Sequence, residues 1–268
     1  MLSHDRTGGG DPLVLIHGLG SARTVWKLVT PALARSFDVI SVDLPGHGQT
    51  SWVAGTAMDP RSLADSVRAT LDELGIQRAQ FAGNSLGGWV ALELAASAPD
   101  RVASVTALAP AGMRDRPLEK VSLGFRINRY LAVGLRPIAP VILRNDRLRA
   151  LGFARNSPVW KTWSIETCRD AADAMAGCKG YDAALAGILH RLADCTLRIP
   201  STIPVTIVFG DTDNALPPST SQSRRHAPAH ARWLEWERCG HAIQLDYPDR
   251  VVELIRDVVG ARAVGSQR

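Results

Sequence analysis

The sequence predicts an α/β protein with a mostly parallel sheet flanked by helices and an inserted helical segment. Three observations support this fold class. Short apolar runs alternate with amphipathic stretches, which is typical of successive strand–helix units. The 268 residues are 46% hydrophobic, enough for the core of one large domain with an insertion. Residues 112–198 show helical patterns without a convincing strand.

The first half of the chain alternates between strand and helix patterns. Strands are predicted at 13–17, 37–42, 79–82 and 102–109, each a short run rich in buried residue types. Helices are predicted at 22–34, 60–75 and 88–96. Asp59 before Pro60 is typical of a helix start, and Gly75 is typical of a helix end. Strands that are connected through helices are expected to run parallel.

The second half begins with the helical segment and then returns to strands. Helices are expected at 166–175 and 181–193, strands at 205–209 and 232–236, and a last helix at 248–259. Ligands of such sheets bind outside the carboxyl ends of the strands, so an insertion there would cover the site. We therefore predict a core of residues 1–111 and 199–268 and a cap of residues 112–198.

A reactive serine is predicted where the strand at 79–82 meets the helix at 88–96. The intervening sequence is Gly83-Asn84-Ser85-Leu86-Gly87. A serine on a sharp strand-to-helix turn exposes its hydroxyl above the sheet, and glycines two residues away prevent collisions. The alternative is a glycine-rich loop that merely contains a serine. The strand and helix on either side favour a nucleophile.

A serine hydroxyl needs a base to react, and the base needs an acid to orient it. His241 follows the last predicted strand, on a loop at the same edge of the sheet, and histidine titrates near neutral pH. Asp211 and Asp213 follow the preceding strand, at 205–209, and either could supply the acid.

Taken together, these motifs resemble those of the α/β-hydrolase superfamily. The resemblance rests on H-G-L-G at 17–20, D-L-P-G-H-G at 43–48, the Ser85 turn, and the G-x-x-D and G-H motifs that end at Asp213 and His241. It implies a cofactor-free and metal-free serine hydrolase. Ser85 would be the nucleophile, His241 the base and Asp213 the orienting acid, in the order that this fold uses. The backbone N–H groups of Leu19 and Leu86 would form the oxyanion hole.

Three further residues are candidates for contact with the substrate. His17 must lie near the site, and Trp160 and Trp163 belong to the predicted cap. Each has a structural alternative, because His17 and His47 could fix their turns and the tryptophans could pack in the core of the cap. Trp89, on the helix after Ser85, is expected to be a core residue.

The sequence departs from the superfamily pattern at two places. About a dozen residues precede Leu13, so the first strand of the usual antiparallel pair is expected to be missing and the second to be short. The loop after His17 lacks the G-P-G turn of many relatives that cleave C–C bonds. A serine at position 85 also argues against a dehalogenase, which uses aspartate there.

Composition limits the partners. No run of apolar residues is long enough for a membrane span, the N-terminus lacks a signal-like stretch, and four cysteines are scattered, so we expect a cytoplasmic protein with reduced thiols. Residues 114–161 hold eleven Lys or Arg and three Asp or Glu. No nucleic-acid motif accompanies this charge, which favours a solvated helical face over a patch that attracts an anionic substrate. The oligomeric state is not predicted.

The functional hypothesis is a carboxylesterase-like hydrolase, of class EC 3.1.1, that acts on an ester-like bond of a small molecule through an acyl-enzyme. A lactonase, a thioesterase or a C–C bond hydrolase would use the same residues. A lyase or haloperoxidase-like activity, or a slow-turnover receptor, is the more distant alternative. The substrate is not predicted, because the pocket depends on how the cap docks.

Overall fold

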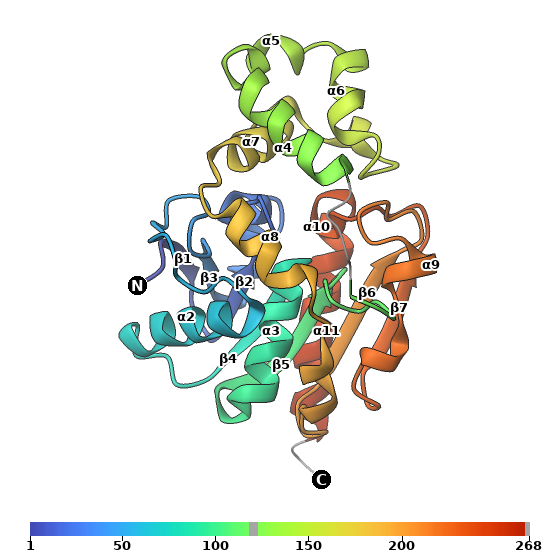
Figure 1. The fold of residues 1–268 in the computed structure, drawn as a ribbon. Helices are drawn as coiled ribbons and strands as arrows, with labels where there is room; N and C mark the ends of the chain where they lie inside the picture. Colours follow the sequence, from blue (N-terminus) through green and yellow to red (C-terminus); the bar gives the residue numbers. More distant parts are fainter. Residues whose placement is uncertain (118–122, 266–268) are drawn as a thin grey trace.

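The computed structural model describes residues 1–117 and 123–265, and these residues form one seven-stranded sheet (Figure 1). The strand order is β1-β3-β2-β4-β5-β6-β7, and every neighbouring pair is parallel except β1 with β3. The strands are β1 His4–Gly8, β2 Asp11–Ile16, β3 Phe37–Val42, β4 Ala79–Asn84, β5 Val102–Leu108, β6 Val205–Gly210 and β7 Arg232–Trp236. The predicted fold class is therefore confirmed.

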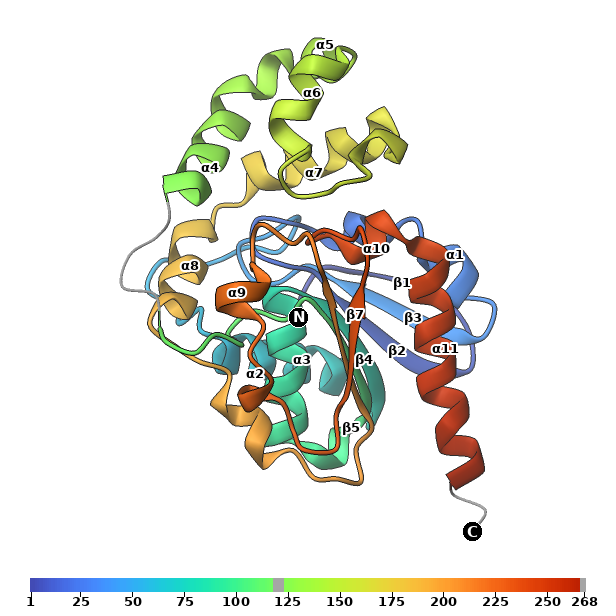
Figure 2. The same ribbon diagram turned by 90° about the vertical axis from the view of Figure 1, so that its right-hand side faces the viewer.

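Helices cover both faces of this sheet, which explains why every residue of β3, β4, β5 and β6 is buried. Figure 2 shows α2 and α3 on one side and α1 and α11 on the other. The core helices are α1 Thr30–Leu33, α2 Pro60–Glu73, α3 Leu86–Ser97, α9 Pro218–Ser221, α10 Ile243–Asp246 and α11 Pro248–Gly265. Short 3₁₀ helices occupy Arg23–Trp26, Pro99–Arg101 and Arg224–His226.

Helix α2 shows how local chemistry sets the helix ends. The Asp59 carboxylate accepts hydrogen bonds from the backbone N–H groups of Arg61 and Ser62, which would otherwise lack partners. Pro60 occupies the first turn, where its missing N–H costs nothing. Gly75 follows the helix at a φ of +71°, a left-handed conformation that favours glycine. The helix predicted over 60–75 is present.

The continuous helix predicted over 22–34 is wrong. The segment forms a 3₁₀ turn at Arg23–Trp26 and then the single-turn helix α1. Pro31 lies in the first turn of α1 and has no N–H to continue a helix from the preceding turn. The Thr30 hydroxyl instead donates to the Trp26 carbonyl, 3.0 Å away, at the junction.

The N-terminal residues form the antiparallel edge strand β1, paired with β3 from His4 opposite Val42 to Gly8 opposite Asp38. The Arg6 guanidinium also contacts the Asp38 carboxylate at 2.6 Å across this pair. One strand of the implied antiparallel pair is thus present, and its five residues make it short.

A group of helices follows β5 and precedes β6 in the sequence. In space, these helices form a separate layer above the sheet (Figures 1 and 2). These inserted helices are α4 Leu123–Leu135, α5 Ala139–Ile142, α6 Asp146–Phe153, α7 Ile165–Gly177 and α8 Tyr181–Leu189, with 3₁₀ turns at Arg136–Ile138, Trp160–Thr162 and Asp194–Arg198. Leu143, Trp163 and Cys168 pack with Leu245 of α10 in a small apolar cluster, apart from the main core. The helix predicted over 181–193 ends earlier, at Leu189.

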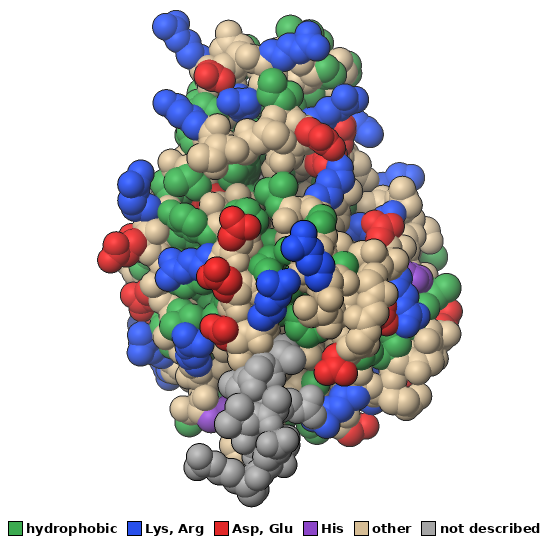
Figure 3. Space-filling model, turned by 180° about the vertical axis from the view of Figure 1, so that it is seen from behind, with side chains coloured by type: hydrophobic (Ala, Val, Ile, Leu, Met, Phe, Trp, Pro, Cys, Tyr) green, Lys and Arg blue, Asp and Glu red, His purple; other side chains and the backbone are tan. Residues whose placement is uncertain are grey.

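The outer inserted helices, which are α4, α5 and α6, carry both arginines and exposed apolar side chains. Figure 3 shows Lys and Arg side chains over the upper part of the molecule, which these helices form. Some basic groups have internal partners: Arg129 donates to the backbone carbonyls of Met175 and Cys178, and Arg136 pairs with Asp173. Among the side chains that the structure describes, the large apolar ones exposed there are Ile127, Tyr130, Leu131, Val133, Leu135, Ile138, Val141, Leu148 and Leu151.

Among the described helices, none combines the length and the apolar character needed to cross a membrane.

Candidate active site

Ser85 sits between the end of β4 and the start of α3 with a φ of +55° and a ψ of −117°. A residue other than glycine rarely adopts this backbone conformation, because it is strained. Such strain persists only where the surrounding structure holds it. Three backbone hydrogen bonds do so: the Ser85 N–H donates to Leu108 at 2.9 Å, and its carbonyl accepts from Trp89 and Ala111. The backbone of Ser85 is therefore fixed by β5, by the loop after β5 and by α3.

The two glycines of the turn are required by close packing. A Cβ on Gly83 would lie 2.3 Å from the Gly87 carbonyl oxygen, and a Cβ on Gly87 would lie 2.1 Å from the Ile16 carbonyl oxygen. Both distances are far below any real Cβ contact. Helix α3 can therefore approach β2 and β4 only because these positions lack side chains.

The loop after β2 lies against Ser85. A Cβ on Gly18 would be 3.0 Å from the Ser85 Cβ and 3.6 Å from its Oγ. Leu19 follows Gly18 directly, and Leu86 is the first residue of α3, whose N–H groups at this end lack partners within the helix. The two predicted oxyanion-hole residues thus belong to the two backbone segments that meet at Ser85.

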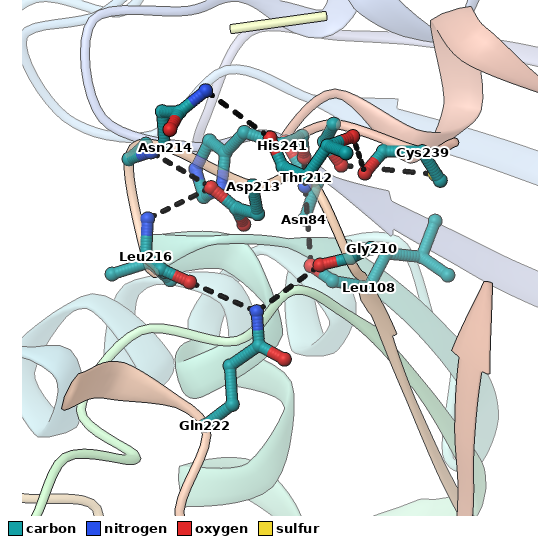
Figure 4. A network of polar contacts seen from close by, with 12 residues as sticks. Asn84, Leu108, Gly210, Thr212, Asp213, Asn214, Leu216, Gln222, Cys239 and His241 are labelled. Carbon is teal, nitrogen blue, oxygen red and sulfur yellow. Dashed lines mark hydrogen bonds and ion pairs between the residues drawn. The ribbon is translucent and has the colours of Figure 1, made fainter. Parts of the chain in front are cut away.

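Asp213 and His241 form a hydrogen-bonded pair on neighbouring loops (Figure 4). His241 Nδ1 lies 2.7 Å from Asp213 Oδ2, and the other carboxylate oxygen accepts from the N–H groups of Ala215 and Leu216, both at 2.8 Å. The Asp213 side chain is fully buried, whereas the His241 side chain keeps 19% of its surface exposed. Asp211, the alternative acid, is exposed and accepts only from the Cys239 N–H among the bonds of the described residues.

The environment of His241 raises its pKa. Burial alone would lower the pKa below its ordinary value of 6.5 because it disfavours the charged ring. The charge of Asp213 and its hydrogen bond outweigh burial, and the Asp246 charge adds to them, so the net pKa is raised. A raised pKa makes the His241 ring a stronger base than a free imidazole.

Asn84 joins the serine turn to the histidine loop. Its Nδ2 donates to the carbonyl of Leu108 at 3.1 Å and to the carbonyl of His241 at 3.0 Å, and the contact with Leu108 is drawn in Figure 4. Gln244 in turn donates to Asn84 Oδ1 at 3.3 Å. The backbone of His241 is therefore held by the residue that directly precedes Ser85.

The contacts of His17 favour the structural alternative. Its Nδ1 bonds the Gly18 carbonyl at 2.8 Å, its Nε2 accepts the Leu44 N–H at 3.0 Å, and the side chain is fully buried. Burial lowers the pKa of His17 and lowers that of His47 to about 3, so both rings are neutral. They fix two turns beside the site and leave no free nitrogen on His17 for a substrate.

The tryptophans singled out in the sequence are all buried. Trp163 donates its indole N–H to Asp246 Oδ1 at 3.2 Å, and Trp160 packs beneath the cationic groups of Arg149 and Lys161. Trp89 is 1% exposed and belongs to the main core, as the sequence predicts. These contacts give Trp160 a packing role within the inserted segment and Trp163 a packing role between this segment and α10.

Two inserted helices reach the loop that carries Leu19. A Cβ on Gly20 would lie 2.6 Å from Met175 Sδ and 3.0 Å from a Tyr181 ring carbon. Met175 belongs to α7 and Tyr181 to α8, so these two helices lie directly over this loop.

One acidic residue of this region carries no signal in the sequence. Asp246 lies on α10, five residues after His241, and its carboxylate contacts Ser157, Trp163 and Gly240. Ser157 and Trp163 lie 89 and 83 residues before Asp246 in the sequence, so no local pattern connects them with it. Within the described ranges, no cluster of three or more His, Cys, Asp or Glu side chains is arranged to hold a metal ion.

Residues 13–254 match a sequence profile described as the alpha/beta hydrolase family. The chain is 46% identical over 249 residues to a dihydrolipoyllysine-residue acetyltransferase component of the acetoin cleaving system of Pseudomonas putida, covering 91% of this chain and 62% of that protein. It thus spans less than two thirds of this relative's length. It is 32% identical over 271 residues to a pimeloyl-[acyl-carrier protein] methyl ester esterase of Aeromonas hydrophila, covering 97% of this chain and 99% of that protein.

Solved structures show the same fold. A thermophilic esterase from Thermogutta terrifontis superimposes with a TM-score of 0.74 at 24% sequence identity, covering 97% of this chain and 93% of that chain.

Proposed function

This chain belongs to the alpha/beta hydrolase family, and from that premise we propose that it is a cofactor-free serine hydrolase. It would cleave an ester-like carbonyl bond of a small molecule through an acyl-enzyme on Ser85. The observation that carries the proposal is the strained backbone of Ser85 at the edge of the sheet where His241 and Asp213 are paired. Backbone strain of this kind is typical of functional sites, where the surrounding contacts hold it.

In the first half of the reaction, Ser85 Oγ attacks the carbonyl carbon of the substrate while His241 accepts the hydroxyl proton through Nε2. Asp213 holds Nδ1–H at 2.7 Å and stabilises the imidazolium. The carbonyl oxygen becomes an oxyanion, which the N–H groups of Leu19 and Leu86 stabilise, each worth about 3 kcal/mol in such sites. The C–O bond then breaks, and His241 returns the proton to the leaving alcohol.

In the second half, a water molecule attacks the acyl-enzyme. His241 accepts a proton from this water and passes it to Ser85 Oγ as the acyl–serine bond breaks. The products are a carboxylic acid and the free enzyme.

We further propose that residues 112–198 act as a cap over a core of residues 1–111 and 199–268. The contacts of Met175 and Tyr181 with Gly20 support this division, because they bring α7 and α8 over the loop of Leu19. The acyl pocket would then lie between these helices and the Ser85 turn. Trp160 and Trp163 would shape it from behind through packing rather than through direct contact.

The relatives suggest the substrate class. By their names, one relative transfers an acetyl group on a dihydrolipoyllysine residue and another cleaves a methyl ester on an acyl-carrier protein. Both reactions replace a group bonded to the carbonyl carbon of an acyl compound. We therefore propose an acyl ester or thioester as the substrate. A lactone or the C–C bond of a diketone would use the same residues. Transfer of the acyl group to a thiol instead of water is the second candidate function, favoured by the 46% identical acetyltransferase component.

The test is labelling with a fluorophosphonate followed by assays on p-nitrophenyl esters of increasing chain length, lactones and acyl thioesters. We expect a single adduct on Ser85 and ester hydrolysis that Ser85→Ala abolishes while ligand binding is retained. A folded wild-type protein that leaves Ser85 unlabelled would refute the proposed function. Negligible turnover with tight binding would favour a receptor instead.

A further inference from the structure

The Asp246 carboxylate connects the inserted helices to the loop of His241. Its Oδ1 accepts hydrogen bonds from Ser157 Oγ at 2.6 Å and from the Trp163 indole N–H at 3.2 Å. Its Oδ2 accepts from the Gly240 N–H at 2.7 Å. The residue is 7% exposed. A buried carboxylate is costly unless its lone pairs are used, and here both oxygens are bonded across two parts of the molecule.

A second contact joins the same two parts. The His241 N–H donates to the Asn156 carbonyl at 2.9 Å. A Cβ on Gly240 would lie 2.1 Å from the Asn156 carbonyl oxygen and 2.8 Å from the Ser157 Cα. The backbone of residues 156–157 therefore rests directly on the backbone that carries the histidine, and only glycine fits at position 240.

The histidine loop is thus held from three directions. The Gly240 and His241 N–H groups are bonded to Asp246 and Asn156, the His241 carbonyl accepts from Asn84, and the ring is bonded to Asp213. No step of the proposed reaction uses Asp246, yet its carboxylate bonds both the histidine loop, at Gly240, and the inserted segment, at Ser157 and Trp163.

We propose that Asp246 is a positioning residue for His241, and that through Ser157 and Trp163 it ties the position of the base to the docking of the inserted helices. This inference rests on the proposed function, in which His241 is the base. A movement of residues 156–163 would then change the position of His241. A misplacement of about 1 Å at such a group costs on the order of 10²-fold in rate.

The charge of Asp246 gives this role a specific signature. The acidic groups that act on His241 are Asp213 and, more weakly, Asp246, and both favour the protonated ring. Asp211 and Arg250 act on the charge of the neighbouring Cys239 thiol instead. Burial raises the pKa of Asp246 itself, while its hydrogen bonds oppose the rise. Replacing Asp246 by asparagine removes a negative charge, so the pKa of His241 should fall.

The experiment compares Asp246→Asn with wild type and with Asp257→Asn, which removes an exposed acidic group from α11. The rate of fluorophosphonate labelling of Ser85 is measured across pH, and the pKa of His241 is measured by NMR. For D246N we expect labelling slowed on the order of 10²-fold, with its acidic limb shifted to lower pH and a lower His241 pKa. For D257N we expect wild-type behaviour.

Ser157→Ala tests the tie to the inserted helices without changing any charge, and it serves if D246N does not fold. We expect slower labelling with an acidic limb that is not lowered. A folded D246N with the wild-type rate and acidic limb would overturn the proposal, and a wild-type rate in S157A would overturn the tie. If the wild type itself fails to label, the proposed function fails, and the His241 pKa in the two proteins still decides whether Asp246 acts on the histidine.

Discussion

At the residue scale, the site depends on two strained or buried groups that cost stability. Ser85 is held at a positive φ, and Asp213 is a fully buried carboxylate. Both are compensated locally: Ser85 by three backbone hydrogen bonds, and Asp213 by two backbone N–H donors and the His241 ring. The two N–H donors leave one carboxylate oxygen free to orient the ring.

Asp213→Asn tests whether this acid sets the tautomer of His241. The asparagine amide can direct an N–H toward Nδ1, which would place the ring proton on Nε2. A protonated Nε2 cannot accept the proton of the Ser85 hydroxyl. We expect kcat for ester hydrolysis to fall on the order of 10³- to 10⁴-fold with the fold intact, measured by steady-state kinetics and circular dichroism.

The matched control is Asp211→Asn, two residues earlier, which should remain close to wild type because Asp211 contacts the Cys239 N–H and not the ring. A larger loss in D211N than in D213N would mean that the acid has been assigned to the wrong residue.

At the scale of elements, the turn between β4 and α3 lets the helix pack closely against the sheet. The helix begins directly after Ser85, and its first turn passes so close to β2 that Gly87 lies against the Ile16 carbonyl. The same closeness brings the loop after β2 to the serine, since a Cβ at Gly18 would meet the Ser85 side chain. The position of Ser85 relative to the loop that carries Leu19 therefore depends on the close approach of α3 to β2.

Gly87→Ala should break this contact. Its Cβ would meet backbone atoms, which cannot move aside cheaply, so we expect the free energy of unfolding to drop by about 3 kcal/mol or more. Gly134→Ala on α4 is the control, because nothing lies within 4 Å of its Cβ position. There alanine should be neutral or stabilise by up to about 1 kcal/mol. Urea unfolding of both variants measures the difference, and equal stabilities would contradict the packing argument.

At the scale of the whole molecule, the main core and the inserted helices differ in packing. Every residue of β4 is buried, whereas within residues 129–156 the buried side chains are Leu143 and Arg149. The outer inserted helices therefore have little apolar burial to stabilise them, and they attach to the core mainly through α7, α8 and the contacts of Asp246.

This difference predicts the pattern of hydrogen exchange. Amides of α4, α5 and α6 should exchange through local opening, well before those of β2, β4 and β5, which need global unfolding. Exchange followed by mass spectrometry at peptide resolution would show it. Protection of α4–α6 equal to that of β4 would mean that the two parts unfold as one unit.

The sequence alone determined the sheet, the serine turn and the order of the three candidate catalytic residues. These features are set by local chemistry. Apolar runs make buried strands, Asp59 caps the start of α2 and Gly75 follows its end, and glycines at 83 and 87 permit a sharp turn. Choosing Asp213 over Asp211 needed the family resemblance as well, because two carboxylates two residues apart look alike in one sequence.

Tertiary structure decided what depends on partners distant in the chain. His17 turned out to accept a hydrogen bond from the Leu44 N–H, and Trp163 to donate one to Asp246. The break in the helix expected at 22–34, by contrast, has a local cause in Pro31. Asp246 had no sequence signal, because its partners at 157, 163 and 240 converge only when the inserted helices lie over the sheet. Hydrogen bonds of this kind act between surfaces, and a linear pattern records only neighbours along the chain.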